Sequence, residues 1–111
     1  MKNKGLPIGL FNGTVATTDG LYRIQDIDTD KARKYLKEND FISAIGHKAT
    51  AEIMSDLLEV PIPMNRIQFH QEIGQIVIAF KLNQRPPEGD VLSRAEVEGI
   101  GYQLKIIERL E

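Results

Sequence analysis

The run that most constrains the fold lies at residues 75–82, Gln-Ile-Val-Ile-Ala-Phe-Lys-Leu. It is rich in β-branched and aromatic residues, which suit the pleated surface of a strand. A nearly continuous apolar run of this length is typical of a strand that is buried within a sheet. We therefore expect residues 75–82 to form a central strand, and other segments to supply the neighbouring strands and the helices.

The rest of the chain supplies further strand and helix signals. Four segments are apolar or alternate as strands do, at residues 8–11, 21–27, 65–70 and 102–110. Three segments show helical periodicity or capping residues, at residues 31–39, 47–58 and from residue 93 onward. The predicted order is β, β, α, α, β, β, α, β. This order predicts an α/β fold over residues 1–111, a single domain with a mixed sheet of about five strands and helices packed on it.

The composition excludes several classes of protein. The 111 residues include no cysteine, which excludes a thiolate nucleophile, a disulfide framework and a cysteine-based zinc site. The 14 basic and 16 acidic residues do not give the basic excess that a sequence-blind DNA coat usually has. No apolar run approaches the roughly 20 residues that span a bilayer, and the first residues lack the apolar core of a signal peptide. We expect a cytoplasmic protein with no membrane contact and no stable DNA complex.

The stretch from Ser43 to Thr50 holds the first candidate for a functional group. It places His47 directly after Gly46, at the start of a predicted helix. The start of a helix gathers unpaired backbone N–H groups and the positive end of the helix dipole, and can therefore hold an anion. Histidine is the side chain most able to transfer a proton near neutral pH. The stretch predicts a phosphate-handling acid/base site, with an ordinary histidine at a helix start as the alternative.

Two loops that follow predicted strands carry further candidates. Arg85 and Glu88 lie in the loop after the central strand, and two prolines between them restrict their separation. Asn12 and Gly13 follow the first strand. Loops on rigid scaffolds often carry function, and open α/β sheets bind ligands beyond the carboxyl ends of their strands. The alternatives are a plain Asn-Gly turn and a local surface ion pair.

These residue types point to a narrow range of chemistry. The two histidines, His47 and His70, do not have metal-ligand spacing, and neither a Gly-x-Ser-x-Gly nor a Gly-x-x-x-x-Gly-Lys-Ser/Thr motif is present. Histidine, arginine, glutamate and backbone N–H groups remain. They suit transesterification of RNA, in which the 2′-hydroxyl is the nucleophile. The enzyme then positions that oxygen, stabilises the phosphorane charge and protonates the leaving 5′-oxygen. We expect no metal and no cofactor.

Three blocks of the sequence resemble one known family in order and spacing. They are S-A-I-G-H-x-x-T-A at residues 43–51, N-R-I at residues 65–67 and K-L-x-x-R-x-P-E-G at residues 81–89. From about residue 6 to residue 110, the chain is similar to the YddF-like proteins of bacteria and their mobile elements. That group includes viral type III anti-CRISPR ring nucleases, which cleave cyclic tetra-adenylate, the second messenger of type III CRISPR defence. The resemblance implies a small α/β homodimer that binds the ring across its interface. It also implies metal-independent cleavage to linear di-adenylate ending in a 2′,3′-cyclic phosphate.

The resemblance implies a role for each residue that matches the family. His47 matches the catalytic histidine, which acts as general acid toward the leaving oxygen. Glu88 matches the glutamate that supports this histidine, and Arg85 matches the arginine at the scissile phosphate. The positions that match the ligand-binding pocket are Asn12, Gly13, Gly46, Thr50 and Arg66.

Two other functions are compatible with the same residues. One is a non-catalytic dimer that binds a nucleotide or a nucleic acid, which predicts tight binding without product. The other is a structural partner protein of a mobile element, which predicts that His47 is buried and paired away from any pocket.

Overall fold

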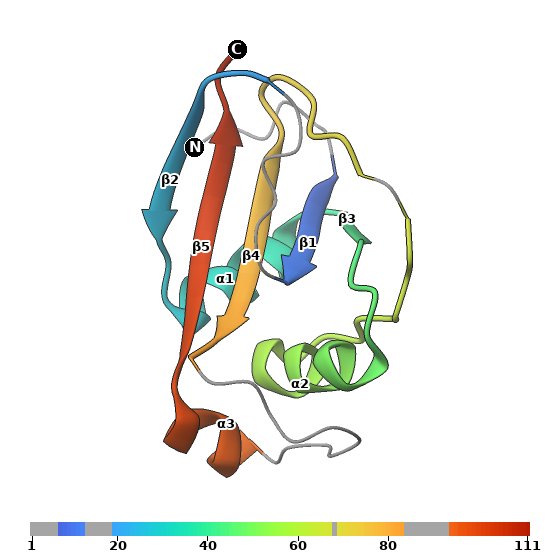
Figure 1. The fold of residues 1–111 in the computed structure, drawn as a ribbon, viewed down its shortest axis with the longest axis vertical. Helices are drawn as coiled ribbons and strands as arrows, with labels where there is room; N and C mark the ends of the chain where they lie inside the picture. Colours follow the sequence, from blue (N-terminus) through green and yellow to red (C-terminus); the bar gives the residue numbers. More distant parts are fainter. Residues whose placement is uncertain (1–6, 13–18, 68, 84–93) are drawn as a thin grey trace.

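In the computed structural model, the chain forms a five-stranded mixed sheet with three helices among the described residues (Figure 1). The structure describes residues 7–12, 19–67, 69–83 and 94–111, without the side chains of Asn12 and Arg94. The strands are β1 (Ile8–Asn12), β2 (Tyr22–Asp26), β3 (Phe41–Ser43), β4 (Ile76–Leu82) and β5 (Tyr102–Arg109). The helices are α1 (Thr29–Glu38), α2 (Lys48–Leu58) and α3 (Arg94–Ile100). The predicted α/β class, with a mixed sheet of about five strands, is confirmed.

The sheet has the order β2-β5-β4-β1-β3, so the predicted central strand, β4, has a neighbour on each side. β1 runs parallel to β3 and to β4, whereas β5 runs antiparallel to β4 and to β2. Leu10 of β1 lies opposite Ser43 of β3 and Ile78 of β4. The carboxyl ends of the three parallel strands therefore meet at one edge, toward which the arrowheads of β1 and β4 point in Figure 1. Loops that leave this edge lead to His47 and toward Arg85.

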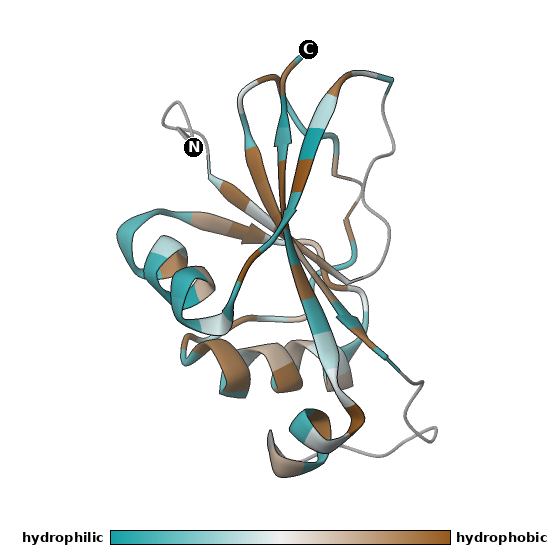
Figure 2. Ribbon diagram, turned by 90° about the vertical axis from the view of Figure 1, so that its left-hand side faces the viewer, coloured by the Kyte–Doolittle hydropathy of each residue, from teal (hydrophilic) through white to brown (hydrophobic). Residues whose placement is uncertain are grey.

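One face of the sheet forms the main hydrophobic core with the helices. Ile8, Leu10, Ile78 and Phe80 on this face are nearly or fully buried. The helical side chains that pack against them are Ala32, Leu36, Ala51, Ile53, Met54, Leu57, Leu58 and Val97. Figure 2 shows the apolar sides of the helices turned toward the sheet. This packing anchors α2 along its apolar stripe, as its sequence periodicity predicts.

The opposite face of the sheet carries a smaller apolar cluster, which includes Val77, Ala79 and Ile107. Phe69, from the extended segment between α2 and β4, packs on this face with its ring edge-on to Phe11, at a centroid distance of 5.1 Å. Gly9 allows the contact, because a Cβ atom there would lie 2.9 Å from Cζ of Phe69. The segment is therefore fastened to β1.

The predicted strand at residues 65–70 is wrong. Its described residues are extended but pair with no strand of the sheet. Phe69 packs on a face of the sheet, whereas Ile67 is 44% exposed, so the two side chains do not share the buried face that a strand would give them. The prediction also missed β3, because three residues are too few to show alternation. The observed order is β, β, α, β, α, β, α, β.

The ends of the helices agree with the sequence signals to within one or two residues. Asp28 caps α1, because its carboxylate accepts a hydrogen bond from the Lys31 N–H at 2.7 Å. Gly101 follows α3 with a φ of 86°, the left-handed conformation that ends many helices and favours glycine. Glu59 ends α2 in the left-handed conformation, with a φ of 56°, so the helix stops two residues before Pro61.

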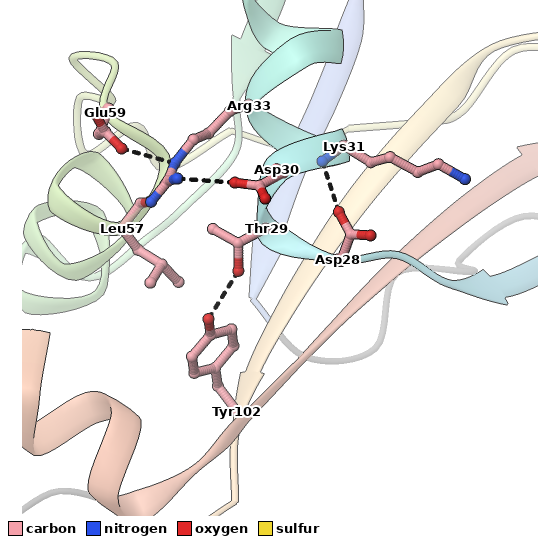
Figure 3. A network of polar contacts seen from close by, with 8 residues as sticks. All are labelled: Asp28, Thr29, Asp30, Lys31, Arg33, Leu57, Glu59 and Tyr102. Atoms are coloured by element: carbon pink, nitrogen blue, oxygen red, sulfur yellow. Dashed lines mark hydrogen bonds and ion pairs between the residues drawn. The ribbon is translucent and has the colours of Figure 1, made fainter.

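Arg33 of α1 fixes the C-terminal end of α2 (Figure 3). Its Nε and Nη2 atoms donate hydrogen bonds to the Leu57 carbonyl at 3.0 and 2.8 Å. The carboxylates of Asp30 and Glu59 lie 3.1 and 3.0 Å from the same guanidinium. The last turn of a helix has carbonyl groups without intrahelical partners and a partial negative charge, so a cation is favourable there.

Candidate functional site

His47 is the N-cap residue of α2. Its backbone is extended, with φ −127° and ψ 127°, and its carbonyl accepts a hydrogen bond from the Ala51 N–H at 3.0 Å. An N-cap side chain normally accepts a hydrogen bond from the first turn. His47 makes no such bond, and its side chain is exposed. Among the described residues, no side chain caps the start of α2, and N–H groups in such a position can bind an anion.

A second segment holds the backbone that leads to His47. We call this segment, residues 63–66, the brace. Asn65 donates from its backbone N to the Ile45 carbonyl and from Nδ2 to the Ser43 carbonyl, both at 2.8 Å. The Ser43 hydroxyl donates to the Pro63 carbonyl at 2.6 Å. Because Ser43 is only 5% exposed, these hydrogen bonds join two parts of the chain in a nearly buried position.

Arg66 completes the brace next to His47. Its Nε donates to the Gly46 carbonyl at 2.8 Å, although the side chain is exposed. The Arg66 side chain packs close to the Gly46 backbone, because a Cβ atom at Gly46 would lie 3.4 Å from Cγ of Arg66. No described residue accepts a hydrogen bond from Nη1 or Nη2 of Arg66. The side chain therefore places a largely uncommitted positive charge beside the start of α2.

The structure brings part of the predicted site together. Gly46, His47 and Arg66 are contiguous through the Arg66–Gly46 hydrogen bond, and Thr50 lies half-buried in the first turn of α2. Asn12 is the last residue of β1, at the sheet edge from which the chain continues from β3 toward His47. The predictions for Gly13, Arg85 and Glu88 fall outside the described residues. β4, the strand before Arg85, ends at the same edge.

A cavity of about 410 Å³ lies near the other end of α2 and contains none of the predicted site residues. It is lined by Asp30, Arg33, Lys34, Lys37, Glu38 and Glu59. Its three basic and three acidic side chains balance in charge, and Arg33 is already committed to Leu57. Nothing in its lining therefore favours one class of ligand.

Two further observations concern classes of site. Within the described ranges, no three side chains of histidine, aspartate or glutamate gather where they could hold a metal ion. The helices of those ranges are also too short or too polar to cross a membrane.

The sequence prediction assigned Arg66 to the pocket but missed its neighbour, Asn65. Asn65 makes two of the brace hydrogen bonds, one from its side chain and one from its backbone. The signal was present in the block N-R-I, where an asparagine precedes the arginine. The block did not show which segment the asparagine would contact, because its partner is separated by 22 residues in sequence.

The fold and the site geometry can now be compared with known proteins. The sequence profile of the STIV B116-like family matches residues 8–104. The uncharacterised protein YddF of Bacillus subtilis (strain 168) is 34% identical over 108 residues, which cover 96% of this chain and all of that protein. The chain therefore belongs to the STIV B116-like family.

Two viral proteins are similar as well. Uncharacterised protein 26 of Sulfolobus islandicus filamentous virus (isolate Iceland/Hveragerdi) is 36% identical over 85 residues, which cover 76% of this chain and 72% of that protein. The solved structure of B116 of Sulfolobus turreted icosahedral virus superposes with a TM-score of 0.76 at 21% identity. The superposition covers 93% of this chain and 99% of B116, and it shows that the two proteins share a fold.

Proposed function

We propose that this chain is a metal-independent ring nuclease that cleaves a cyclic oligoadenylate, with cyclic tetra-adenylate as the expected substrate. The observation that carries the proposal is the exposed, uncapped position of His47 at the start of α2, beside the guanidinium of Arg66. A proton donor, a positive charge and the first N–H groups of α2 would then be available to one anion. The three sequence blocks that resemble the ring nucleases include all of these residues.

The reaction is a transesterification within the RNA ring. The 2′-oxygen attacks the neighbouring phosphorus and forms a bond with it, while the bond from phosphorus to the 5′-oxygen breaks. His47 donates a proton to the leaving 5′-oxygen, which becomes a hydroxyl group. The proton of the 2′-hydroxyl passes to solvent base. The product ends in a 2′,3′-cyclic phosphate, so the reaction consumes no water.

The remaining residues would stabilise charge and set geometry. The N–H groups at the start of α2 and the guanidinium of Arg66 would hold phosphate oxygens. By resemblance to the family, Arg85 would stabilise the scissile phosphate and Glu88 would support His47. A preorganised charge at the scissile phosphate, the role given to Arg85, is usually the largest single contribution to catalysis of this kind, whereas the charge of Arg66 would serve binding of the ring.

The proposal includes a homodimer. In a two-fold dimer, two copies of His47 would face a single ligand. A ring of four identical nucleotides contains a two-fold axis, so both copies could engage it equivalently. Two cuts would then release two linear di-adenylates. In a type III CRISPR system, such cleavage would remove the second messenger and switch off the response. Light scattering during size-exclusion chromatography measures the dimer directly.

The first test is incubation of the protein with cyclic tetra-adenylate in excess chelator. We expect linear di-adenylate with a 2′,3′-cyclic phosphate, identified by mass spectrometry, at the same rate with and without chelator. The variant His47→Ala should cut at least 100-fold more slowly, because a general acid contributes about 10²- to 10⁴-fold.

The matched control is His70→Ala, which removes the other histidine, also exposed. It should cut at the parental rate. An intact ring after prolonged incubation, or a His47→Ala variant as fast as the parent, would refute the nuclease. Tight binding of the ring without any product would instead support the non-catalytic binding dimer.

A further inference from the structure

We infer that the brace is a positioning device for His47, in which Asn65 and Arg66 orient the histidine through its own backbone. The kinetic part of the inference rests on the proposed function, and the structural part rests on the hydrogen bonds of the brace. It adds a role for Asn65, which no sequence block explained. It also gives Arg66 a second role, distinct from that of a charge beside the ligand.

The first argument is that the brace reaches the peptide unit that carries His47. The Gly46 carbonyl and the His47 N–H belong to one planar peptide group. A hydrogen bond from Arg66 Nε to that carbonyl, at 2.8 Å, therefore fixes the plane from which the His47 Cα extends. On the other side, the His47 carbonyl is held by the Ala51 N–H of α2. The backbone of His47 is thus held at both ends, while its exposed side chain makes no capping bond.

The second argument is that the peptide units before His47 are held in the same way. The unit between Ser43 and Ala44 is bonded on both sides, because Ala44 N donates to Leu10 at 2.9 Å and the Ser43 carbonyl accepts from Asn65. The Ile45 carbonyl accepts from the Asn65 backbone N–H. A loop held by so many hydrogen bonds has few accessible conformations. A catalytic group on such a loop can be placed to the accuracy that proton transfer demands.

The third argument is that the nitrogen atoms of the Arg66 guanidinium differ in their hydrogen-bond partners. Its Nε is committed to Gly46, whereas Nη1 and Nη2 have no partner among the described residues. The same guanidinium can therefore fix His47 and offer two N–H groups to a phosphate. A substitution that keeps the positive charge but removes the Nε donor should therefore lower kcat. A substitution that keeps the donor but removes the charge should raise KM.

The chain permits such a separation with a matched pair of variants. Arg66→Gln keeps an N–H donor three carbons from the Cα, where Arg66 has its Nε, but removes the charge. Arg66→Lys keeps the charge but has no donor at that position. Because Arg66 is exposed, both variants should unfold at nearly the same urea concentration as the parent.

We expect Arg66→Lys to lower kcat by about 10- to 100-fold with KM within about threefold, because misplacement of a reacting group costs up to about 10²-fold. Arg66→Gln should keep kcat within about threefold and raise KM. Asn65→Leu, which removes the side-chain donor to Ser43, should lower kcat in the same direction as Arg66→Lys.

A second measurement is independent of activity. In the ligand-free protein, the backbone amide of His47 should have an NMR order parameter near 0.85, the value of a rigid backbone, in the parent and in Arg66→Gln. It should fall clearly in Arg66→Lys. If the parent fails to cleave the ring, the proposed nuclease is refuted, and the order parameters alone then decide the positioning role.

The inference holds only if Arg66→Lys loosens the His47 amide while Arg66→Gln leaves it unchanged, and if, in an active parent, kcat follows the same order. Any other pattern overturns it. In particular, a parental kcat in Arg66→Lys would show that Arg66 acts through its charge alone.

Discussion

The two ends of α2 differ in whether other side chains satisfy their unpaired backbone groups. At the C-terminal end, Arg33 donates twice to the Leu57 carbonyl and lies against the carboxylates of Asp30 and Glu59 (Figure 3). At the N-terminal end, the cap residue is a histidine that makes no capping bond. One end has its unpaired backbone groups and its charge satisfied internally. The other end is open in the sense that no described side chain caps it.

The arginines at the two ends of α2 differ in the same way, in how far their hydrogen-bonding groups are already used. Arg33 and Arg66 each donate to a backbone carbonyl beside an end of α2. The side chain of Arg33 is only 17% exposed and carboxylates flank it, so its hydrogen-bonding capacity serves the fold. Arg66 is exposed and uses only Nε among the described residues. Natural proteins give up stability at functional sites, and the open end of α2 is where this protein would do so.

The largest expected effect is that of His47→Asp, which adds a side-chain cap at the start of α2. An aspartate at the N-cap accepts a hydrogen bond from the first turn and favours the helix dipole. Cleavage should fall at least 100-fold, because the general acid is lost. At neutral pH the free energy of unfolding should rise by about 1 kcal/mol relative to His47→Ala. Urea denaturation and the ring-cleavage assay measure the two changes on the same samples.

His47→Ala is the control for this prediction, because it removes the imidazole without adding a cap. Equal unfolding free energies in the aspartate and alanine variants would show that the start of α2 is already satisfied. The contrast between the two ends of the helix would then be lost.

The next largest effect is that of Arg33→Ala, which removes the hydrogen bonds at the C-terminal end of α2. The variant loses two hydrogen bonds from a charged donor, and it leaves the Leu57 carbonyl without them. We expect the free energy of unfolding to fall by about 2 kcal/mol, since hydrogen bonds to charged groups contribute about 1.5–3 kcal/mol. The matched variant Arg66→Ala should lose no more than about 0.5 kcal/mol, because its side chain is exposed. Equal losses in the two variants, measured by urea denaturation, would contradict the distinction between the two arginines.

This contrast also shows how far the sequence could predict the molecule. The apolar run of β4, the helical signals of the segment that forms α1 and the periodicity of α2 each reflect local energetics, and each gave the correct element. The predictions failed where the outcome depends on contacts between distant segments. Residues 65–70 alternate in sequence as a strand does, but the contact of Phe69 with Gly9 and Phe11 fixes Phe69 on a face of the sheet.

At the site, too, local signals could be predicted and contacts between distant segments could not. The position of His47 at the start of a helix could be predicted, because capping and periodicity are local signals. The brace could not, because Asn65 and Arg66 reach carbonyls that are 20 or 22 residues away. Only the fold brings the two segments together. The ring-nuclease function itself rests on the sequence blocks and on the exposure of His47, and stays a prediction until the cleavage assay is done.

The smallest expected effect is that of Gly46→Ala, which tests whether binding of the ligand requires a residue without a side chain at position 46. A Cβ at Gly46 would lie 3.4 Å from Cγ and 4.0 Å from Nε of Arg66, which is close to ordinary van der Waals contact. The backbone of Gly46 is not in the left-handed conformation, so an alanine there is not strained. The free energy of unfolding should therefore change by no more than about 0.5 kcal/mol. A ligand that approaches the backbone would nevertheless meet the new methyl group, so KM for the ring should rise several-fold while kcat stays near the parental value. A parental KM would show that the ligand does not approach the backbone at Gly46.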